Sequence, residues 1–284
     1  MTGKGLDTKD PGDSDQGTVS VEDLDLDIGG VHLKGRWLTP NGVDTGPVLV
    51  FLHEGLGCIR MWKDFPERLC RATGLRGFLY ERQGFGGSDP IPVGPRPFDY
   101  LHVEGEQVLP QVLDQVGIRP RQHILIGHSD GGTIALLFAA ARPMEPLAAI
   151  TEAAHVFVED VTIAGVLDAK TAWETTNLRD RLARYHGENV DGAFHGWNDT
   201  WRRSAFKGWT MVDELPDIRC PLLVIQGEED EYGTQMQVEE ILRWSSGPAE
   251  GLMIPNCAHI PHLQAKDSVL GAMGEFIERV LHQG

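Results

Sequence analysis

The chain has 284 residues and carries 25 Lys and Arg against 42 Asp and Glu, which gives a formal net charge of −17 at pH 7. This length is enough for one α/β domain with an insertion. The acidic balance argues against a nucleic-acid partner and against an anionic membrane surface, because both need a basic face on the protein.

The first part of the chain divides into a polar tail and an apolar hairpin. Residues 1–18 are mostly Gly, Asp, Lys, Ser and Pro, so we expect them to be disordered. Alternating apolar residues begin at Val19, are interrupted by Gly29-Gly30 and resume as far as Trp37. This pattern predicts an antiparallel hairpin. After it, strands and helices alternate, which favours a parallel sheet with helices on both faces.

The segment 124–135 is the most informative part of the sequence, because it places G-x-S-x-G between an apolar strand and a helix. Side chains at Gly127 and Gly131 would collide with the neighbouring elements. The sharp turn lifts the Ser129 hydroxyl clear of the sheet and leaves the Asp130 N–H at a helix N-terminus, where it can stabilise an oxyanion. A glycine-rich turn with a capping serine is the ordinary alternative.

A helix-rich stretch follows the strand expected at 146–151 and extends to the strand expected at 221–227. Four of the seven tryptophans fall in this stretch, namely Trp173, Trp197, Trp201 and Trp209. We expect most of them to pack against one another, with one or two facing a substrate.

Two later strands end in residues that suit an acid and a base. The strand at 221–227 is followed by Glu228-Glu229-Asp230, and the strand at 251–255 leads to His259 and His262. A lone histidine is more often a surface or core residue than a base. His259 is favoured over His262 because it lies in the loop directly after the strand.

Taken together, these segments resemble the α/β-hydrolase fold over nearly the whole chain after the tail, in the chain order Ser, Asp, His. The resemblance implies a mostly parallel eight-stranded sheet with helices on both faces. It also implies a core formed by residues 19–152 and 218–284, with a helical cap at 153–217. It makes Ser129 the nucleophile, His259 the general base, and Asp230, three residues after Gly227, the acid.

The loop after the strand at 48–52 has the place that supplies the second oxyanion N–H in this superfamily. The usual His-Gly reads His53-Glu54 here, so the donor is Gly55 or Leu56, and alignment favours Gly55. The segment 81–88 resembles D-x-x-G-x-G-x-S, with Glu where Asp is common.

The residues around Ser129 also resemble the elbow of the valacyclovir hydrolase family, also called biphenyl hydrolase-like proteins. In that family the aspartate equivalent to Asp130 binds the α-ammonium of an aminoacyl ester. The resemblance implies a carboxylic ester with an α-amino or otherwise cationic acyl group, bound by Asp130. Glu54 and Glu159 would add to such a cation-preferring site if they face the cavity, and Glu159 could equally be solvated. A structural Asp130 at the helix N-terminus is the alternative.

Two other function classes use the same triad. A carbon–carbon bond hydrolase of vinylogous diketones would need a basic pocket, for which Arg60 and Arg179 are the candidates. A hydrolase-derived small-molecule binding protein would bind without turnover. In each case we expect a small-molecule partner, no nucleic acid, no membrane, no metal and no cofactor, and the sequence leaves homo-oligomerisation open.

The cysteines and the N-terminal residues indicate in which cell compartment we expect the protein. The four cysteines form no C-x-x-C pair and no ligand spacing with histidine, which is typical of reduced residues in a cytoplasmic protein. Cys257 lies near His259 and could line the site, although a core position is the ordinary expectation. The N-terminus lacks the apolar stretch of a signal peptide, and no apolar run reaches transmembrane length.

Overall fold

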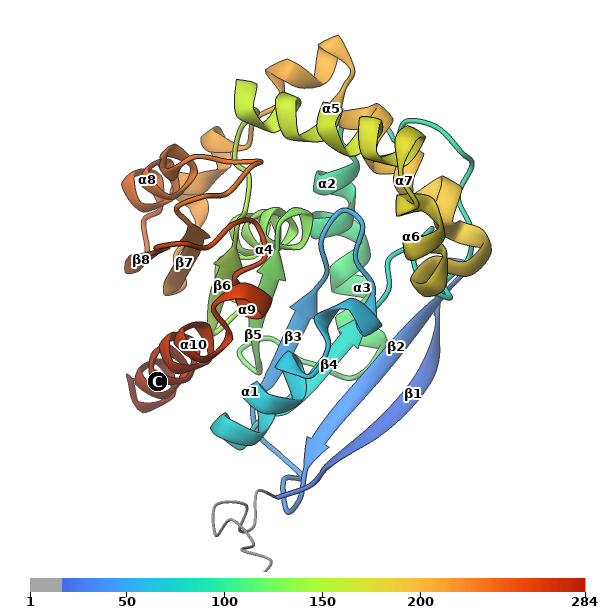
Figure 1. The fold of residues 1–284 in the computed structure, drawn as a ribbon. Coiled ribbons are helices and arrows are strands. Elements are labelled where there is room, and N and C mark those ends of the chain that lie inside the picture. Colours follow the sequence, from blue (N-terminus) through green and yellow to red (C-terminus); the bar gives the residue numbers. More distant parts are fainter. Residues whose placement is uncertain (1–16, 284) are drawn as a thin grey trace, which may run out of the picture.

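A computed structural model describes residues 17–283, so all but the last two residues of the predicted tail lie outside the described residues. It contains one sheet with helices packed against both faces (Figure 1). The strands are β1 (Val19–Ile28), β2 (Val31–Pro40), β3 (Val48–Leu52), β4 (Arg76–Tyr80), β5 (His123–His128), β6 (Ala148–Glu152), β7 (Leu222–Gly227) and β8 (Ala249–Ile254).

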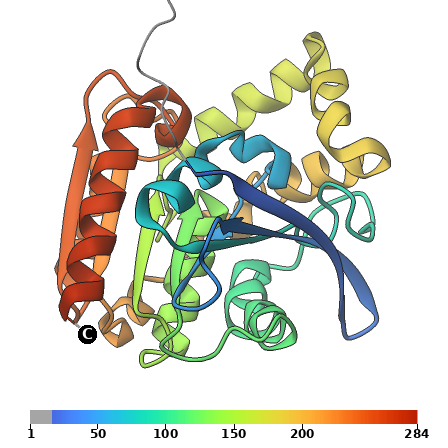
Figure 2. The same ribbon diagram turned by 90° about the horizontal axis from the view of Figure 1, so that it is seen from below.

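The strands lie in the order β1-β2-β4-β3-β5-β6-β7-β8. β1 and β2 form the predicted antiparallel hairpin, and β2 pairs antiparallel with β4. The remaining neighbours pair parallel. This arrangement confirms the mostly parallel eight-stranded sheet. Figure 2 shows the hairpin extending from one side of the molecule, opposite the strands at the other edge.

Helices on the two faces bury alternate side chains of the strands. α1 (Phe65–Thr73) and α10 (Lys266–Gln283) cover one face, while α3 (Leu109–Gln115), α4 (Asp130–Ala141) and α8 (Gln235–Trp244) cover the other. In β3, Val50 and Leu52 join the cluster that contains α4, whereas Leu49 and Phe51 join the one that contains α1 and α10. Each face of the central strand is therefore apolar, as expected for a parallel sheet covered on both sides.

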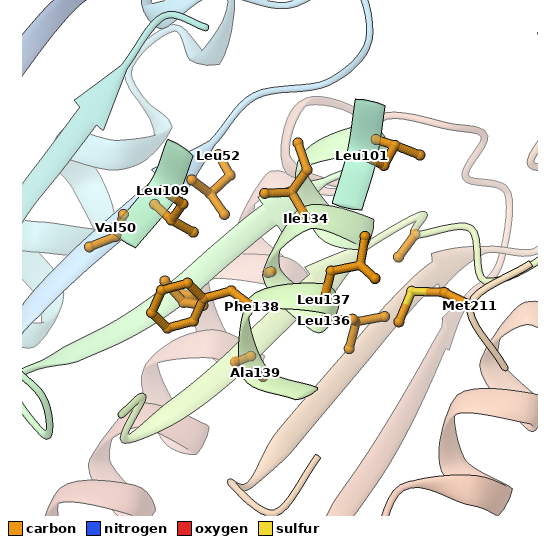
Figure 3. Packing of buried hydrophobic residues seen from close by; sticks show 14 of the residues in the cluster. Val50, Leu52, Leu101, Leu109, Ile134, Leu136, Leu137, Phe138, Ala139 and Met211 are labelled. Carbon is orange, nitrogen blue, oxygen red and sulfur yellow. The ribbon is translucent and has the colours of Figure 1, made fainter. Parts of the chain in front are cut away.

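α4 is buried along nearly its whole length, from Asp130 to Ala140. A helix that is apolar all round belongs in a core rather than on a surface. Figure 3 shows Ile134, Leu137 and Phe138 of α4 packed among side chains of β3, of α2 (Tyr100–Val103) and of α3. This packing fixes the N-terminus of α4, and with it the residues of the elbow.

The segment 153–217 lies between β6 and β7 and contains α5 (Asp160–Thr175), α6 (Leu178–His186) and α7 (Val190–Trp201). A short 3₁₀ turn at Gly187–Asn189 joins α6 to α7, and two more follow α7 at Ser204–Gly208 and Val212–Asp217. Figure 1 shows the three helices together above the sheet. Trp173 stacks on Phe194 with ring centroids 3.9 Å apart, and Trp201 and Trp209 pack around Phe206.

All four cysteines are buried free thiols, and Cys257 belongs to the core cluster beside α10. Within residues 17–283 no group of three or more His, Cys, Asp or Glu side chains is arranged to hold a metal ion. No helix in that range is long and apolar enough to cross a membrane.

Candidate active site

Ser129 lies in the sharp turn between β5 and α4, with φ of 52° and ψ of −118°. This left-handed conformation is costly for a residue with a side chain and persists where the surroundings impose it. A Cβ atom on Gly127 would overlap the carbonyl of Gly131, and one on Gly131 would overlap the carbonyl oxygen of Leu52. The two glycines therefore let the turn close on itself and against the end of β3.

The side chains of Ser129, His259 and Asp230 form one hydrogen-bonded chain. His259 Nε2 lies 2.9 Å from Ser129 Oγ, and His259 Nδ1 lies 2.8 Å from Asp230 Oδ1. Asp230 also accepts the Tyr232 N–H at 2.8 Å. Because an ionised carboxylate only accepts hydrogen bonds, Nδ1 carries the proton and Nε2 is free to take one from the serine.

The charges around His259 favour its protonated form. Burial alone would lower the pKa of His259, but the charge and hydrogen bond of Asp230, with the carboxylates of Glu54 and Glu231, raise the pKa above its ordinary value of 6.5. Burial likewise works against ionisation of Asp230, yet the charge and hydrogen bond of His259 hold its pKa below the ordinary range. This is the electrostatic arrangement that stabilises an imidazolium formed during catalysis.

The competing residues lie elsewhere. His262 Nδ1 contacts Glu152 Oε2 at 2.6 Å rather than the serine. Glu228 and Glu229 are exposed, whereas Asp230 is buried.

The loop that carries His259 is held at three points. His128 Nε2 donates to the carbonyl oxygen of His259 at 2.7 Å, and Glu231 accepts the His259 N–H at 3.3 Å. Gln264 Oε1 accepts the N–H groups of Ala258 and Ile260 at 3.1 Å each. The position of the imidazole is thus fixed by main-chain anchors as well as by Asp230.

The two candidate oxyanion donors come from the ends of β3 and β5. A turn closes with the Gly57 N–H on the carbonyl of Glu54 at 3.1 Å, which leaves the N–H groups of Gly55 and Leu56 outside that bond. Both residues line the cavity that contains Ser129. The Asp130 N–H is the first amide of α4, so it has no acceptor within the helix.

Ser129 faces two cavities. The larger, of about 660 Å³, also contains His259 and Trp197, and its charged lining residues are Glu54, Asp168, Glu231 and Arg181. The smaller, of about 20 Å³, is bounded by Ser129, Asp130 and His259 together with His155, Thr162, Val166, Trp197, Trp201 and Tyr232. Space of that size holds a group no larger than a water molecule or an ammonium.

Asp130 is fully buried, and its two carboxylate oxygens differ. Oδ2 accepts the Tyr100 hydroxyl at 2.8 Å and lies 3.6 Å from Arg82 Nη1. Oδ1 has no hydrogen-bond partner in the described part of the chain. Glu54 Oε2 lies 3.5 Å from His128 Nδ1 and its side chain remains partly exposed in the larger cavity.

Some sequence expectations did not anticipate these surroundings. Glu159, for which the sequence left two positions open, does not line the cavities at Ser129, and its carboxylate accepts hydrogen bonds from Thr234 and Gln237. Arg82 and Tyr100 were not singled out. Arg82 stands in the recognised segment 81–88, but no pattern marks Tyr100, which meets Asp130 only through the tertiary fold.

Comparison with known proteins places the chain in a family. A family model described as "Alpha/beta hydrolase family" matches residues 49–272. The chain is 25% identical over 269 residues to mouse (Mus musculus) "Serine hydrolase BPHL", covering 92% of this chain and 88% of the relative. Among solved structures, the enol-lactonase from Burkholderia xenovorans LB400 is similar in fold, with a TM-score of 0.70 at 18% identity over 90% of this chain and 100% of that one. Since the family model spans most of the sequence, the chain belongs to the alpha/beta hydrolase family.

Proposed function

We propose that this protein is a serine hydrolase that cleaves a carboxylic ester through an acyl-enzyme on Ser129. The observation that carries the proposal is the continuous chain of short contacts from Ser129 through His259 to Asp230. A nucleophile within hydrogen-bond reach of a base, which is itself oriented by a carboxylate, is the signature of nucleophilic acyl transfer.

In the proposed mechanism, His259 Nε2 takes the Ser129 proton as Oγ attacks the ester carbonyl. The N–H groups of Gly55 and Asp130 stabilise the resulting oxyanion, and each such donor is worth on the order of 3 kcal/mol. The imidazolium, stabilised by Asp230, then gives its proton to the leaving alcohol. A water molecule activated by His259 releases the acid and regenerates the enzyme.

We propose further that the preferred ester carries an α-amino or otherwise cationic acyl group. Carboxylates outnumber cations around the larger cavity. Its lining contains Glu54, Asp168 and Glu231 but only one arginine, Arg181. Asp130 borders the small cavity beside Ser129, and its free Oδ1 is an acceptor for an ammonium. The bond from Tyr100 and the nearby Arg82 engage only the other oxygen.

The alternative carbon–carbon hydrolase is less well supported. Arg60 donates to the carbonyls of Arg184 and Tyr185, and Arg179 pairs with Asp191 at 2.6 Å. Neither candidate lines the cavity that contains Ser129, so the basic pocket for a substrate carboxylate is not built from them.

The test is labelling and turnover with the full chain. A fluorophosphonate probe should label the wild type and leave folded Ser129→Ala unlabelled, and the variant should hydrolyse activated esters at least about a thousandfold more slowly. Labelling that persists in Ser129→Ala would refute the assignment. Stoichiometric labelling of a wild type that turns over no ester would favour the binding-protein alternative.

A further inference from the structure

Arg82 contacts both residues that would supply the oxyanion donors. It follows β4, and its side chain is 2% exposed. Nη2 donates to the carbonyl oxygen of Glu54 at 2.7 Å, and Nη1 lies 3.6 Å from Asp130 Oδ2. One planar guanidinium therefore spans the gap between the loop after β3 and the N-terminus of α4.

The contact with Glu54 acts directly on the candidate donor at Gly55. The Glu54 carbonyl and the Gly55 N–H belong to the same trans peptide group, in which they point in opposite directions. A donor bound to the carbonyl from one side thus fixes the direction of the N–H on the other. A charged donor also polarises the peptide, which makes the N–H a stronger hydrogen-bond donor.

His53 supports the same peptide, and Arg82 fixes its tautomer. The Arg82 main-chain N–H donates to His53 Nε2 at 3.1 Å, so Nε2 carries no proton and Nδ1 does. Nδ1 donates to the Glu54 carbonyl at 2.7 Å. Burial, together with the Arg82 charge, holds the pKa of His53 well below its ordinary value, so the ring stays neutral. With the Gly57 N–H, three donors therefore converge on the Glu54 carbonyl, and two of them are side chains.

The contact with Asp130 acts on the second candidate donor. The Asp130 carboxylate is held between Arg82 and the Tyr100 hydroxyl, which in turn accepts the Trp201 indole N–H at 2.9 Å. Both groups act on the same oxygen, Oδ2, so the tyrosine hydrogen bond and the arginine charge together hold the side chain of the first residue of α4 in place.

We infer that Arg82 is a positioning residue that aligns both oxyanion donors at once. This inference rests on the proposed function, because it assigns Arg82 a task only if an oxyanion forms next to Ser129. Arg82 does not touch the substrate; it acts through the Glu54–Gly55 peptide and through Asp130. Its loss should therefore weaken binding of a tetrahedral oxyanion far more than binding of an uncharged ground-state ligand.

Arg96 provides a matched control. It is a second buried arginine of the same cluster, and its guanidinium lies over the rings of Phe85 and Tyr100, 4.6 and 5.7 Å from their centroids. Arg82 lies over the same Phe85 ring at 4.8 Å. Arg96 makes no hydrogen bond to the loop 53–57 among the described residues, so Arg96→Met removes a comparable buried charge without releasing the Gly55 peptide.

The experiment compares a trifluoromethyl ketone, which forms an oxyanion on the serine, with the corresponding secondary alcohol, which does not. Arg82→Met should weaken inhibition by the ketone by about thirtyfold or more, leave inhibition by the alcohol within about threefold, and lower kcat with little change in KM. The quantity compared is the selectivity ratio, which is the inhibition constant of the alcohol divided by that of the ketone. Arg82→Met should lower this ratio, whereas Arg96→Met should leave it at the wild-type value.

The inference would be overturned if Arg82→Met had the selectivity ratio of the wild type. It would also be overturned if Arg82→Met and Arg96→Met lowered this ratio equally. If Arg82→Met does not fold, Arg82→Lys serves instead, since an ammonium can reach one partner but not form both contacts. Its ratio should lie below that of the wild type, and an unchanged ratio would overturn the inference. The proposed function is tested separately, by ester turnover in the wild type and by the loss of ketone binding in Ser129→Ala.

Discussion

The Nδ1 atom of His262 lies 2.6 Å from Oε2 of Glu152, so a second buried histidine–carboxylate pair stands beside that of His259 and Asp230. The ring of His128 lies between them, with its centroid 5.0 Å from that of His262 and 5.2 Å from that of His259. The two pairs have the same chemistry but different access to Ser129, since only His259 reaches its hydroxyl.

This difference predicts which histidine is essential. His259→Ala should lower kcat by at least about a thousandfold, close to the effect of Ser129→Ala, because triad members act as a unit. His262→Ala should lower stability, since it leaves the buried Glu152 unpaired, but each folded molecule should keep most of its activity. Rates normalised to active-site titration decide the question, and an inactive His262→Ala with an active His259→Ala would reverse our assignment.

Glu54 should set part of the pH dependence. A general base works when it is neutral, so activity should fall as the pH drops through the raised pKa of His259. Glu54 is one of the charges that raise this pKa, so Glu54→Gln should move the acid limb of kcat/KM to lower pH. Glu229→Gln is the control, because this exposed carboxylate on the same loop as Asp230 is not among those charges. A shift of the same size in both variants would contradict the prediction.

Asp130 should make the enzyme prefer esters whose acyl group carries a positive charge. Wild type should prefer an α-amino ester to its desamino analogue by about 2 kcal/mol in kcat/KM, as for a charge-assisted hydrogen bond. Asp130→Asn should remove most of this preference and cost little on the desamino ester, because the amide keeps the shape, the backbone donor and an acceptor for Tyr100. Equal losses on both esters would mean that Asp130 is structural.

Trp197 should control which substrates fit. It lines the larger cavity and its indole packs so closely on Gly55 that a Cβ there would overlap it. Trp197→Ala should change KM and the preferred acyl size, whereas Trp173→Ala, which removes the ring stacked on Phe194, should mainly lower Tm. Kinetics across an ester series and thermal melts separate the two. If both variants change only Tm, the segment 153–217 serves packing alone.

Gly131 should be irreplaceable for the elbow. Gly131→Ala places a methyl group on the Leu52 carbonyl, and we expect a loss of at least about 3 kcal/mol of unfolding free energy. Gly274→Ala is the control. Gly274 lies inside α10 with open space around its Cβ position, so alanine should stabilise by about 0.5–1 kcal/mol. Denaturant unfolding measures both, and a tolerated Gly131→Ala would count against the close approach to β3.

The parts of the site that follow from local sequence were predictable. The elbow could be recognised because its glycines, strand and helix are contiguous, and Asp230 and His259 because each lies in the loop that follows a strand. The surroundings of Asp130 were not predictable, since Arg82 and Tyr100 reach it from other elements. The position of Glu159 could not be decided from the sequence for the same reason. Its carboxylate finds partners on Thr234 and Gln237, more than seventy residues further along the chain.

The segment 153–217 leaves the sheet from β6 and returns into β7, and these strands are direct neighbours, with Glu152 opposite Ile225. Because these strands run parallel, the segment leaves at one end of the strands and returns at the other. Its two arms meet closer to the helices, where Phe157 forms an antiparallel bridge with Thr210 and the Met211 N–H donates to the Val156 carbonyl at 2.8 Å. A chimera could therefore exchange the helices beyond this bridge without disturbing the register of any strand. The C-terminal part would have to stay, because the turn at Val212–Asp217 packs directly against α4. A graft that replaces α5 to α7 and ends before Ser204 would exchange much of the lining of the larger cavity while leaving Ser129, Asp230 and His259 on their own elements.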